Sequence, residues 1–164
     1  HPVMGKSGMV ASHNVLSSEI AAEIMANGGN AIDAGAALGF ALAVTLPRAG
    51  NIGGGGFMLV HVADLNKTIA IDFRETAPGL AYRDMFLDDK NEIIPGKSWN
   101  TSSASGVPGS IAGFDLAHKK FGTVSWKSLI KPAVRLAKKG FKLDIKAMHP
   151  ISNVATKYVY KQNI

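Results

Sequence analysis

The sequence predicts an α+β fold, of which these 164 residues form only a part. Two helix-like segments come first, two strand-like segments follow as a hairpin, and further helices come after them. This order lacks the strand–helix alternation of a doubly wound parallel sheet. Because two strands alone rarely form a stable sheet, we expect further strands to come from elsewhere in a larger layered body.

The first helix is predicted over residues 15–26. Asn14 stands immediately before it and can cap its free N–H groups, and Gly28 suits the left-handed residue that ends helices. Before the cap, residues 9–12 form a short apolar run, which indicates a strand or the end of a strand.

A second helix is predicted from residue 31 to about Val44. Asn30 can cap it, and Asp33 lies in its first turn, where the helix dipole favours an anion. Pro47 ends it. Its alanines and glycines are small and apolar on every side, so we expect the helix to be buried between other elements.

A hairpin is predicted after a loop that contains five glycines between residues 50 and 56. Residues 57–62 and 67–73 have strand character, and residues 64–66 form the turn between them. Arg74 comes at the exit of the second strand. Neighbouring residues alternate between the two faces of a strand, so Arg74 lies on the face opposite that of Phe73.

Two more helices are predicted, at residues 109–121 and 126–139, and Gly122 and Gly140 end them. The preceding segment, roughly residues 83–105, is polar and irregular, and we expect it to wrap the surface. The chain is therefore divided into a helix–helix–hairpin core with the arginine (1–80), a surface loop (81–105), a helical part (106–140) and a tail without assignable pattern (141–164).

The composition excludes several classes of function. Without cysteine the chain has no disulfides and no thiolate metal sites, and its five histidines lack metal-ligand spacing, so we expect no metal and no cofactor. The formal charge of +6 comes from scattered or paired lysines instead of a long basic block, which gives no support to a nucleic-acid partner. No apolar run approaches the roughly 18 residues that a membrane-spanning helix needs.

The glycine run at residues 53–56 has two possible roles. Its backbone N–H groups could bind an anion, or its lack of side chains could allow close packing beneath the hairpin. No Gly-Lys-Ser/Thr follows it, and it precedes a strand instead of opening a helix, so it is neither a phosphate loop nor a dinucleotide-binding fingerprint.

Arg74 is the candidate substrate-binding residue. An arginine at a strand exit can present two parallel N–H donors to a carboxylate. The residues alone also allow a simpler interpretation, a structural ion pair with Glu75 or Asp72. No nucleophile can be located, since there is no cysteine and no Gly-x-Ser-x-Gly turn. The paired carboxylates at 88–89 lie in a polar loop and are expected to be solvated.

Six segments in series resemble γ-glutamyltransferases, and the resemblance runs from residue 1 to about residue 140. The segments are GMVAS at 8–12, GGNAIDA at 28–34, GFALAV at 39–44, GNIGGGGF at 50–57, DFRETAP at 72–78 and GVPGSIAG at 106–113. Several motifs in order and at natural spacing are far more specific than any one of them.

The resemblance implies an N-terminal-nucleophile hydrolase fold, a four-layer αββα sandwich. In that family a precursor cuts itself into a large and a small subunit, and the new N-terminal threonine of the small subunit attacks the γ-glutamyl amide. Glutathione is the usual donor, and water or an acceptor amino acid or peptide takes the γ-glutamyl group. Only the beginning of the large subunit is matched, so no catalytic residue is expected in this chain, which alone should be inactive.

The resemblance also implies that Arg74, in the Arg-Glu-x-Ala-Pro motif, binds the α-carboxylate of the γ-glutamyl group. A periplasmic or secreted location and pairing with the small subunit are further implications. Two alternatives remain open: an acylase or poly-γ-glutamate transpeptidase of the same fold, and, from another class, a non-catalytic anion-binding module that uses the glycine run.

Overall fold

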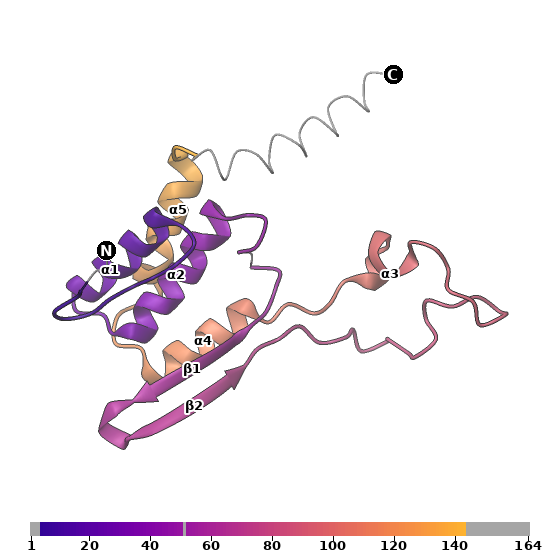
Figure 1. Cartoon of the computed structure of the whole chain (residues 1–164), viewed down its shortest axis with the longest axis horizontal. Coiled ribbons are helices and arrows are strands. Elements are labelled where there is room, and N and C mark those ends of the chain that lie inside the picture. The colour runs from indigo at the N-terminus through magenta and orange to yellow at the C-terminus, as the bar shows by residue number, and fades with distance from the viewer. Residues whose placement is uncertain (1–3, 51, 144–164) are drawn as a thin grey trace.

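The computed structural model describes residues 4–50 and 52–143. Three helices, α1, α2 and α5, lie together, and α4 lies between them and a two-stranded hairpin (Figure 1). The elements are α1 (Val15–Ala26), α2 (Ala31–Thr45), β1 (Phe57–Val62), β2 (Lys67–Asp72), α3 (Lys97–Asn100), α4 (Ser110–Phe121) and α5 (Trp126–Lys139).

The caps predicted for α1 and α2 are confirmed. The Asn14 side chain accepts a hydrogen bond from the backbone N–H of Ser17 at 3.2 Å. Asn30 accepts from the N–H groups of Ile32 and Asp33, and Asp33 accepts in return from the N–H of Asn30. This reciprocal capping box satisfies donors at both ends of the first turn of α2.

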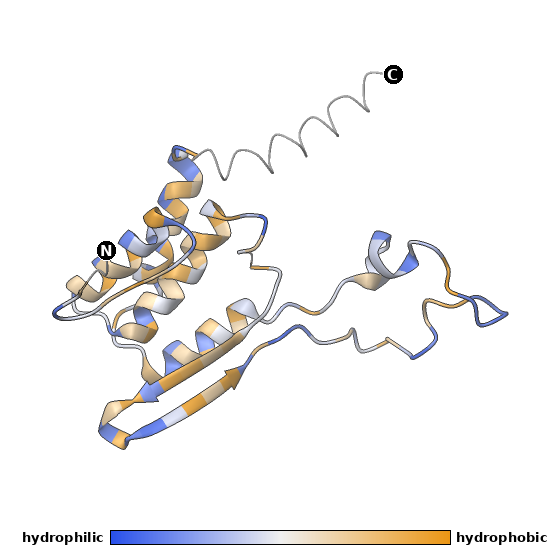
Figure 2. Ribbon diagram, in the orientation of Figure 1, coloured by the Kyte–Doolittle hydropathy of each residue, from blue (hydrophilic) through white to orange (hydrophobic). Residues whose placement is uncertain are grey.

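Helix α2 is the centre of the helical layer, as its composition predicts. Figure 2 shows it apolar along most of its length. Ala36 and Ala37 are fully buried and pack with Leu129 of α5. Thr45 at its end is also buried, and its hydroxyl lies 2.7 Å from that of Ser17 in α1. The small side chains of α2 therefore allow two helices to approach it closely.

The hairpin is antiparallel, with Phe57 paired to Asp72 and Val62 paired to Lys67. One face packs on α4, where Val60 and Ile71 contact Ala117. The opposite face is open: the side chain of Leu59 is 78% exposed, and that of Phe57 is 67% exposed. An apolar sheet face without cover agrees with the expectation that further strands lie elsewhere.

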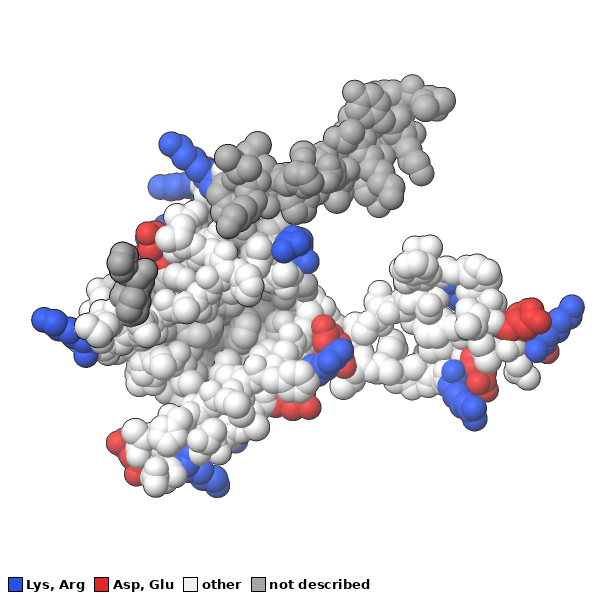
Figure 3. Space-filling view, in the orientation of Figure 1, with Lys and Arg blue, Asp and Glu red and all other residues white. Residues whose placement is uncertain are grey.

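Residues 76–106 form an arm that projects from the body (Figure 1). A bridge between Thr76 and Val107 closes its base, with N–H to O distances of 3.4 and 2.9 Å. The sequence predicts a loop that wraps the surface, but the segment extends away from the helices. In the view of Figure 3, charges of both signs lie toward its far end, and most of the visible face is uncharged.

One expected element is wrong, and one segment lies outside the described residues. Residues 9–12 are not a strand; residues 9–11 instead line a groove with Met25 of α1 and Leu38 of α2. Met9 and Ala11 stay exposed there and Val10 is half-buried, so the run lies beside the helices without joining a sheet. The described part of the tail is residues 141–143, and residues 144–164 are outside it. No helix within residues 4–50 and 52–143 has the length and apolarity needed to span a membrane.

Candidate substrate-binding site

Arg74 lies at the exit of β2, where the sequence predicts it. Phe73 turns toward α4 and joins the apolar cluster there, whereas Asp72 and Arg74 are exposed on the other side. The backbone N–H of Arg74 donates to the Asp72 carboxylate at 3.0 Å. The alternation predicted from the strand pattern is therefore confirmed, and the arginine side chain points away from the core.

The ion pair of Arg74 is loose. Its Nε lies 3.7 Å from the Glu75 Oε2 atom, and the two side chains are 68% and 38% exposed. A charge-assisted hydrogen bond between such groups is about 2.7–2.9 Å long. An exposed pair of this kind contributes little to stability. The ion pair considered from sequence is thus present, but it does not occupy the guanidinium in the way that a buried structural pair would.

A shallow open cavity of about 260 Å³ adjoins Arg74. One wall comes from the exit of β2, and the other comes from the first turns of α4 and the residues before it. Its lining includes Asp72, Phe73, Arg74, Thr76, Val107, Pro108, Gly109 and Ala112. Arg74 therefore forms part of the wall of a space that a small ligand can enter from solvent.

The glycine run packs against this cavity from behind. The carbonyl oxygen of Gly54 accepts from the N–H groups of Gly109 and Ser110 at 2.9 and 3.0 Å, at the start of α4. A Cβ atom at Gly55 would lie 2.6 Å from the carbonyl oxygen of Phe73. These contacts support the close-packing interpretation, because the backbone of the run lies directly against Phe73 and the start of α4, where a side chain would not fit.

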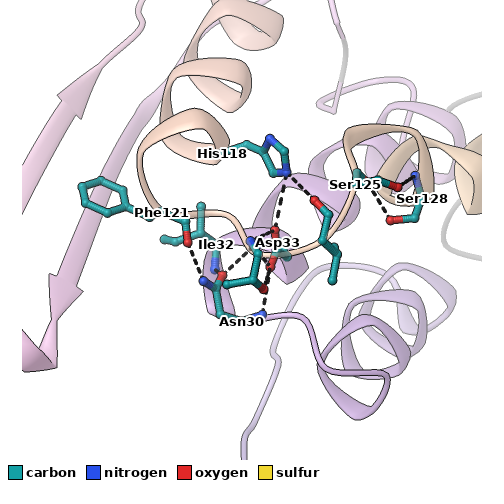
Figure 4. Close-up of polar contacts among 9 residues, drawn as sticks. Asn30, Ile32, Asp33, His118, Phe121, Ser125 and Ser128 are labelled. Carbon is teal, nitrogen blue, oxygen red and sulfur yellow. Dashed lines mark hydrogen bonds and ion pairs between the residues drawn. The ribbon is translucent and has the colours of Figure 1, made fainter.

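A second polar cluster surrounds Asp33 (Figure 4). Its carboxylate is fully buried and accepts from the backbone N–H of Thr123 at 3.0 Å and from the Thr123 hydroxyl at 2.7 Å. The His118 Nε2 atom lies 3.8 Å from Asp33 and 2.7 Å from the Val124 carbonyl oxygen. Since a carbonyl oxygen only accepts, Nε2 carries a proton in this arrangement.

Hydrogen bonding decides the charge state of Asp33. Burial by itself raises the pKa of this carboxyl group, but hydrogen bonds from the Thr123 hydroxyl and from the backbone at Asn30, Thr123 and Val124 outweigh it. The pKa of Asp33 is therefore lowered from its ordinary value of 3.8. With its oxygens occupied by N–H and O–H donors, this carboxylate ties α2 to the α4–α5 connection and does not face a ligand.

The histidines have ordinary packing or surface contacts where the structure describes them. His61 lies on the open face of the hairpin, with its Nδ1 atom 3.2 Å from the Thr68 hydroxyl. His118 contacts Trp126, with ring centroids 5.2 Å apart. His1 and His149 are outside the described residues. Within residues 4–50 and 52–143, no three His, Asp or Glu side chains gather in a way that could hold a metal ion.

The acidic pair at 88–89 has a local role at Asp88. Its carboxylate accepts from the backbone N–H groups of Lys90 and Glu92 at 2.8 and 2.9 Å, and so stabilises a turn in the arm. The pair is far along the arm from the exit of β2 (Figure 1), so it does not join Arg74 in one site.

Sequence reasoning missed the contact between Phe73 and Gly113. A Cβ atom at Gly113 would overlap the Phe73 ring. One available signal was the four-residue spacing of Gly109 and Gly113, which places two glycines on one side of a helix start. No comparable local signal marks Thr123 as the partner of Asp33, because 90 residues separate them.

Comparisons with known proteins agree on one family. The family model described as Gamma-glutamyltranspeptidase matches residues 17–160. The Glutathione hydrolase proenzyme of Escherichia coli (strain K12) is 52% identical over 141 residues, which are 86% of this chain and 24% of that protein. The chain thus spans about a quarter of the length of the curated relatives it matches.

Solved structures share its fold. Helicobacter pylori γ-glutamyltranspeptidase matches with a TM-score of 0.90 and 41% identity, over 97% of this chain and 46% of that one. The Bacillus anthracis transpeptidase enzyme CapD matches with a TM-score of 0.71 and 30% identity, over 93% of this chain and 46% of that one. The open hairpin face and the projecting arm therefore belong to a partial copy of a larger fold.

Proposed function

Because the chain belongs to the γ-glutamyltranspeptidase family, we propose that the complete protein transfers and hydrolyses the γ-glutamyl groups of glutathione and related compounds. The fold is that of the N-terminal-nucleophile hydrolases, and this chain supplies one part of it. We place the bond-making threonine on a small subunit cut from the same precursor, and we assign the protein to the periplasm or the exterior of the cell.

The observation that carries the role of this chain is the accessible guanidinium of Arg74. It is held at a strand exit beside an open cavity, and its recorded ion pair of 3.7 Å is too long to occupy its donors fully. A planar guanidinium matches a carboxylate with two parallel hydrogen bonds. We propose that Arg74 binds the α-carboxylate of the γ-glutamyl donor. Glu75 then either moves away from Nε or shares the guanidinium with this carboxylate.

In the proposed reaction the threonine hydroxyl adds to the γ-carbonyl carbon, and its proton passes to the α-amine of the same threonine. The amide C–N bond then breaks, and the leaving amine takes that proton. The resulting γ-glutamyl ester is cleaved by water or by the amine of an acceptor. Arg74 takes no part in bond-making; by binding the far end of the donor it fixes the γ-carbonyl near the nucleophile.

Replacement of Arg74 tests this assignment in the full-length protein. We expect Arg74→Ala to lower kcat/KM for a γ-glutamyl anilide by about 100-fold or more, since it removes two hydrogen bonds to a charged group and one such bond is worth about 1.5–3 kcal/mol. Arg74→Lys should recover little, because the lysine ammonium cannot form the two parallel bonds. Unchanged KM and kcat/KM in Arg74→Ala would reject the role.

Arg83 provides a matched control. Its Nε lies 3.7 Å from the carboxylate of the next residue, Asp84, which repeats the local geometry of Arg74 and Glu75. It lies on the arm with a side chain that is 96% exposed, so Arg83→Ala should leave the kinetics as they are. Parallel assays with a glutaryl amide separate γ-glutamyl transfer from the acylase alternative.

A further inference from the structure

The Phe73 ring occupies a slot lined by glycines and one aromatic ring. It comes from the exit of β2, one residue before Arg74, and meets Phe114 of α4 edge to face with ring centroids 5.8 Å apart. A Cβ atom at Gly113 would overlap the Phe73 ring, and one at Gly56 would lie 3.0 Å from its Cε2 atom. The ring can sit here only because both neighbours lack a side chain.

The backbone of Phe73 is held as closely as its ring. Its N–H donates to the Gly56 carbonyl oxygen at 3.0 Å, and its own carbonyl oxygen accepts from the Gly56 N–H at 3.4 Å. A Cβ atom at Gly109 would overlap that carbonyl oxygen, and one at Gly55 would lie 2.6 Å from it. Glycines from two separate segments thus fix both the side chain and the peptide of this one residue.

In this arrangement the backbone of Arg74 is held in place, whereas its guanidinium is exposed. The peptide before it is clamped, and its N–H bonds to the Asp72 carboxylate at 3.0 Å. Its side chain is 68% exposed, and few contacts of its own hold it. The direction in which the guanidinium leaves the strand is therefore set by the position of Phe73. A shift of about 1 Å in a group that orients a substrate can lower a rate by about 100-fold.

We propose that Phe73, seated in the slot of Gly56, Gly109 and Gly113, is a positioning residue that directs Arg74 toward the donor carboxylate. The inference rests on the proposed function, since it assumes that Arg74 binds the α-carboxylate. In this proposal the Arg74 guanidinium makes the contact with the carboxylate, and Phe73 acts through the position of its backbone. Filling the slot displaces the ring, and the displaced ring moves the start of the arginine side chain.

The main test is Gly113→Ala in the full-length protein. L-Glutamate and 4-aminobutyrate differ only in the α-carboxylate, so both serve as competitive inhibitors of γ-glutamyl anilide hydrolysis. We expect the KM of the anilide and the Ki of L-glutamate to rise about tenfold, with kcat and the Ki of 4-aminobutyrate nearly unchanged. A parallel rise of both Ki values would indicate general damage to the site and would overturn the proposal.

Two further variants complete the design. In Gly35→Ala the new Cβ meets no heavy atom within 4 Å beyond its neighbours in the same helix, so this change inside α2 should leave every constant as in the wild type. In a Phe73→Gly background the three Phe73 atoms nearest to the new Cβ at Gly113, namely Cγ, Cδ1 and Cβ, are absent, so the second change should cost at most threefold there. An equal loss from Gly113→Ala in both backgrounds would show that the effect does not pass through Phe73.

The outcomes separate this proposal from the proposed function. If the wild type does not hydrolyse the anilide, or if Arg74→Ala leaves its KM unchanged, the function assigned to Arg74 fails first. If Arg74→Ala raises KM but Gly113→Ala does not, only the positioning role fails. Should Gly113→Ala not fold, Gly56→Ala gives a milder clash, 3.0 Å from the ring, and the same pair of Ki values decides.

Discussion

Two charged residues of this chain, Asp33 and Arg74, differ in burial, in partners and in the elements that they join. Asp33 is fully buried, and its carboxylate accepts from Asn30 and Thr123 at 3.2 Å or less. Arg74 is 68% exposed, and its one recorded side-chain ion pair within the described residues is 3.7 Å long. A charge with all its partners inside the protein stabilises the fold, whereas a charge with spare donors at a cavity is available to a ligand.

Their surroundings differ in the same way. Asp33 joins segments about 90 residues apart, since it holds the connection between α4 and α5 against the start of α2. Arg74 follows a clamped residue, Phe73, and extends from it into open space. Changes at Asp33 should therefore lower stability first, and changes at Arg74 should affect substrate affinity with little effect on stability.

The largest expected effect on stability is that of Asp33→Ala. The N–H of Asn30 and both donors of Thr123 would lose their acceptor, and since these donors are only partly buried each loss costs toward the lower end of the about 1–3 kcal/mol of a buried unsatisfied donor. We expect local opening around Thr123 to become easier by about 2–3 kcal/mol. Hydrogen–deuterium exchange of peptides that contain residues 30 and 123 measures this free energy of opening. Protection equal to that of the wild type would show that Asp33 does not stabilise the fold.

Thr123→Val should have a smaller effect of the same kind. It removes the hydroxyl that donates to Asp33 at 2.7 Å but keeps the backbone N–H bond and nearly the same volume. A hydrogen bond to a charged group contributes about 1.5–3 kcal/mol, and we expect a loss near the lower end because the other donors remain. The same exchange measurement applies, and a loss as large as that of Asp33→Ala would show that the threonine, not the carboxylate, holds the cluster.

The sequence predicts the contacts of Asp33 with its neighbours in the chain, but not its contact with a distant segment. Asn30 and Asp33 lie within one turn, so their capping box is encoded in neighbouring residues, and the helix bounds follow from it. The partner of Asp33 across the fold could not be found, because nothing near Thr123 distinguishes it from any other exposed threonine. The projection of the arm was also not predicted, since the bridge that closes its base joins Thr76 to Val107, far apart in the sequence.

The candidate site divides similarly. The alternation Asp72, Phe73, Arg74 is visible in the strand pattern and places the arginine outward, as the structure confirms. The slot beneath Phe73 was not visible, because it depends on where Gly113 of α4 meets the hairpin. The short strand expected at residues 9–12 failed for the opposite reason: an apolar run is equally suited to packing on helices.

Acidification should weaken the Asp33 cluster by less than Thr123→Val does, in the pH range in which the protein still folds. The folded pKa of Asp33 is below its ordinary value of 3.8, so its stabilisation is complete above that pH and is lost as the pH falls through the folded pKa. Exchange protection at Thr123 should therefore decline from about pH 4 downward. Asp33→Asn has no such titration and serves as the control; an equal decline in that variant would assign the effect to other carboxylates.

The smallest expected effect on stability is that of Arg74→Ala. Exposed ion pairs contribute about 0–1 kcal/mol, and the 3.7 Å separation from Glu75 places this one low in that range. We therefore expect exchange protection near Phe73 to change by less than about 0.5 kcal/mol, while the same variant loses about 100-fold in kcat/KM. A stability loss like that of Thr123→Val would make Arg74 a structural residue, and the kinetic loss would then follow from disorder at the strand exit. Separation of the two readouts, with Asp33 variants affecting protection and Arg74 variants affecting affinity, would distinguish a charge that holds the fold from a charge that holds a substrate.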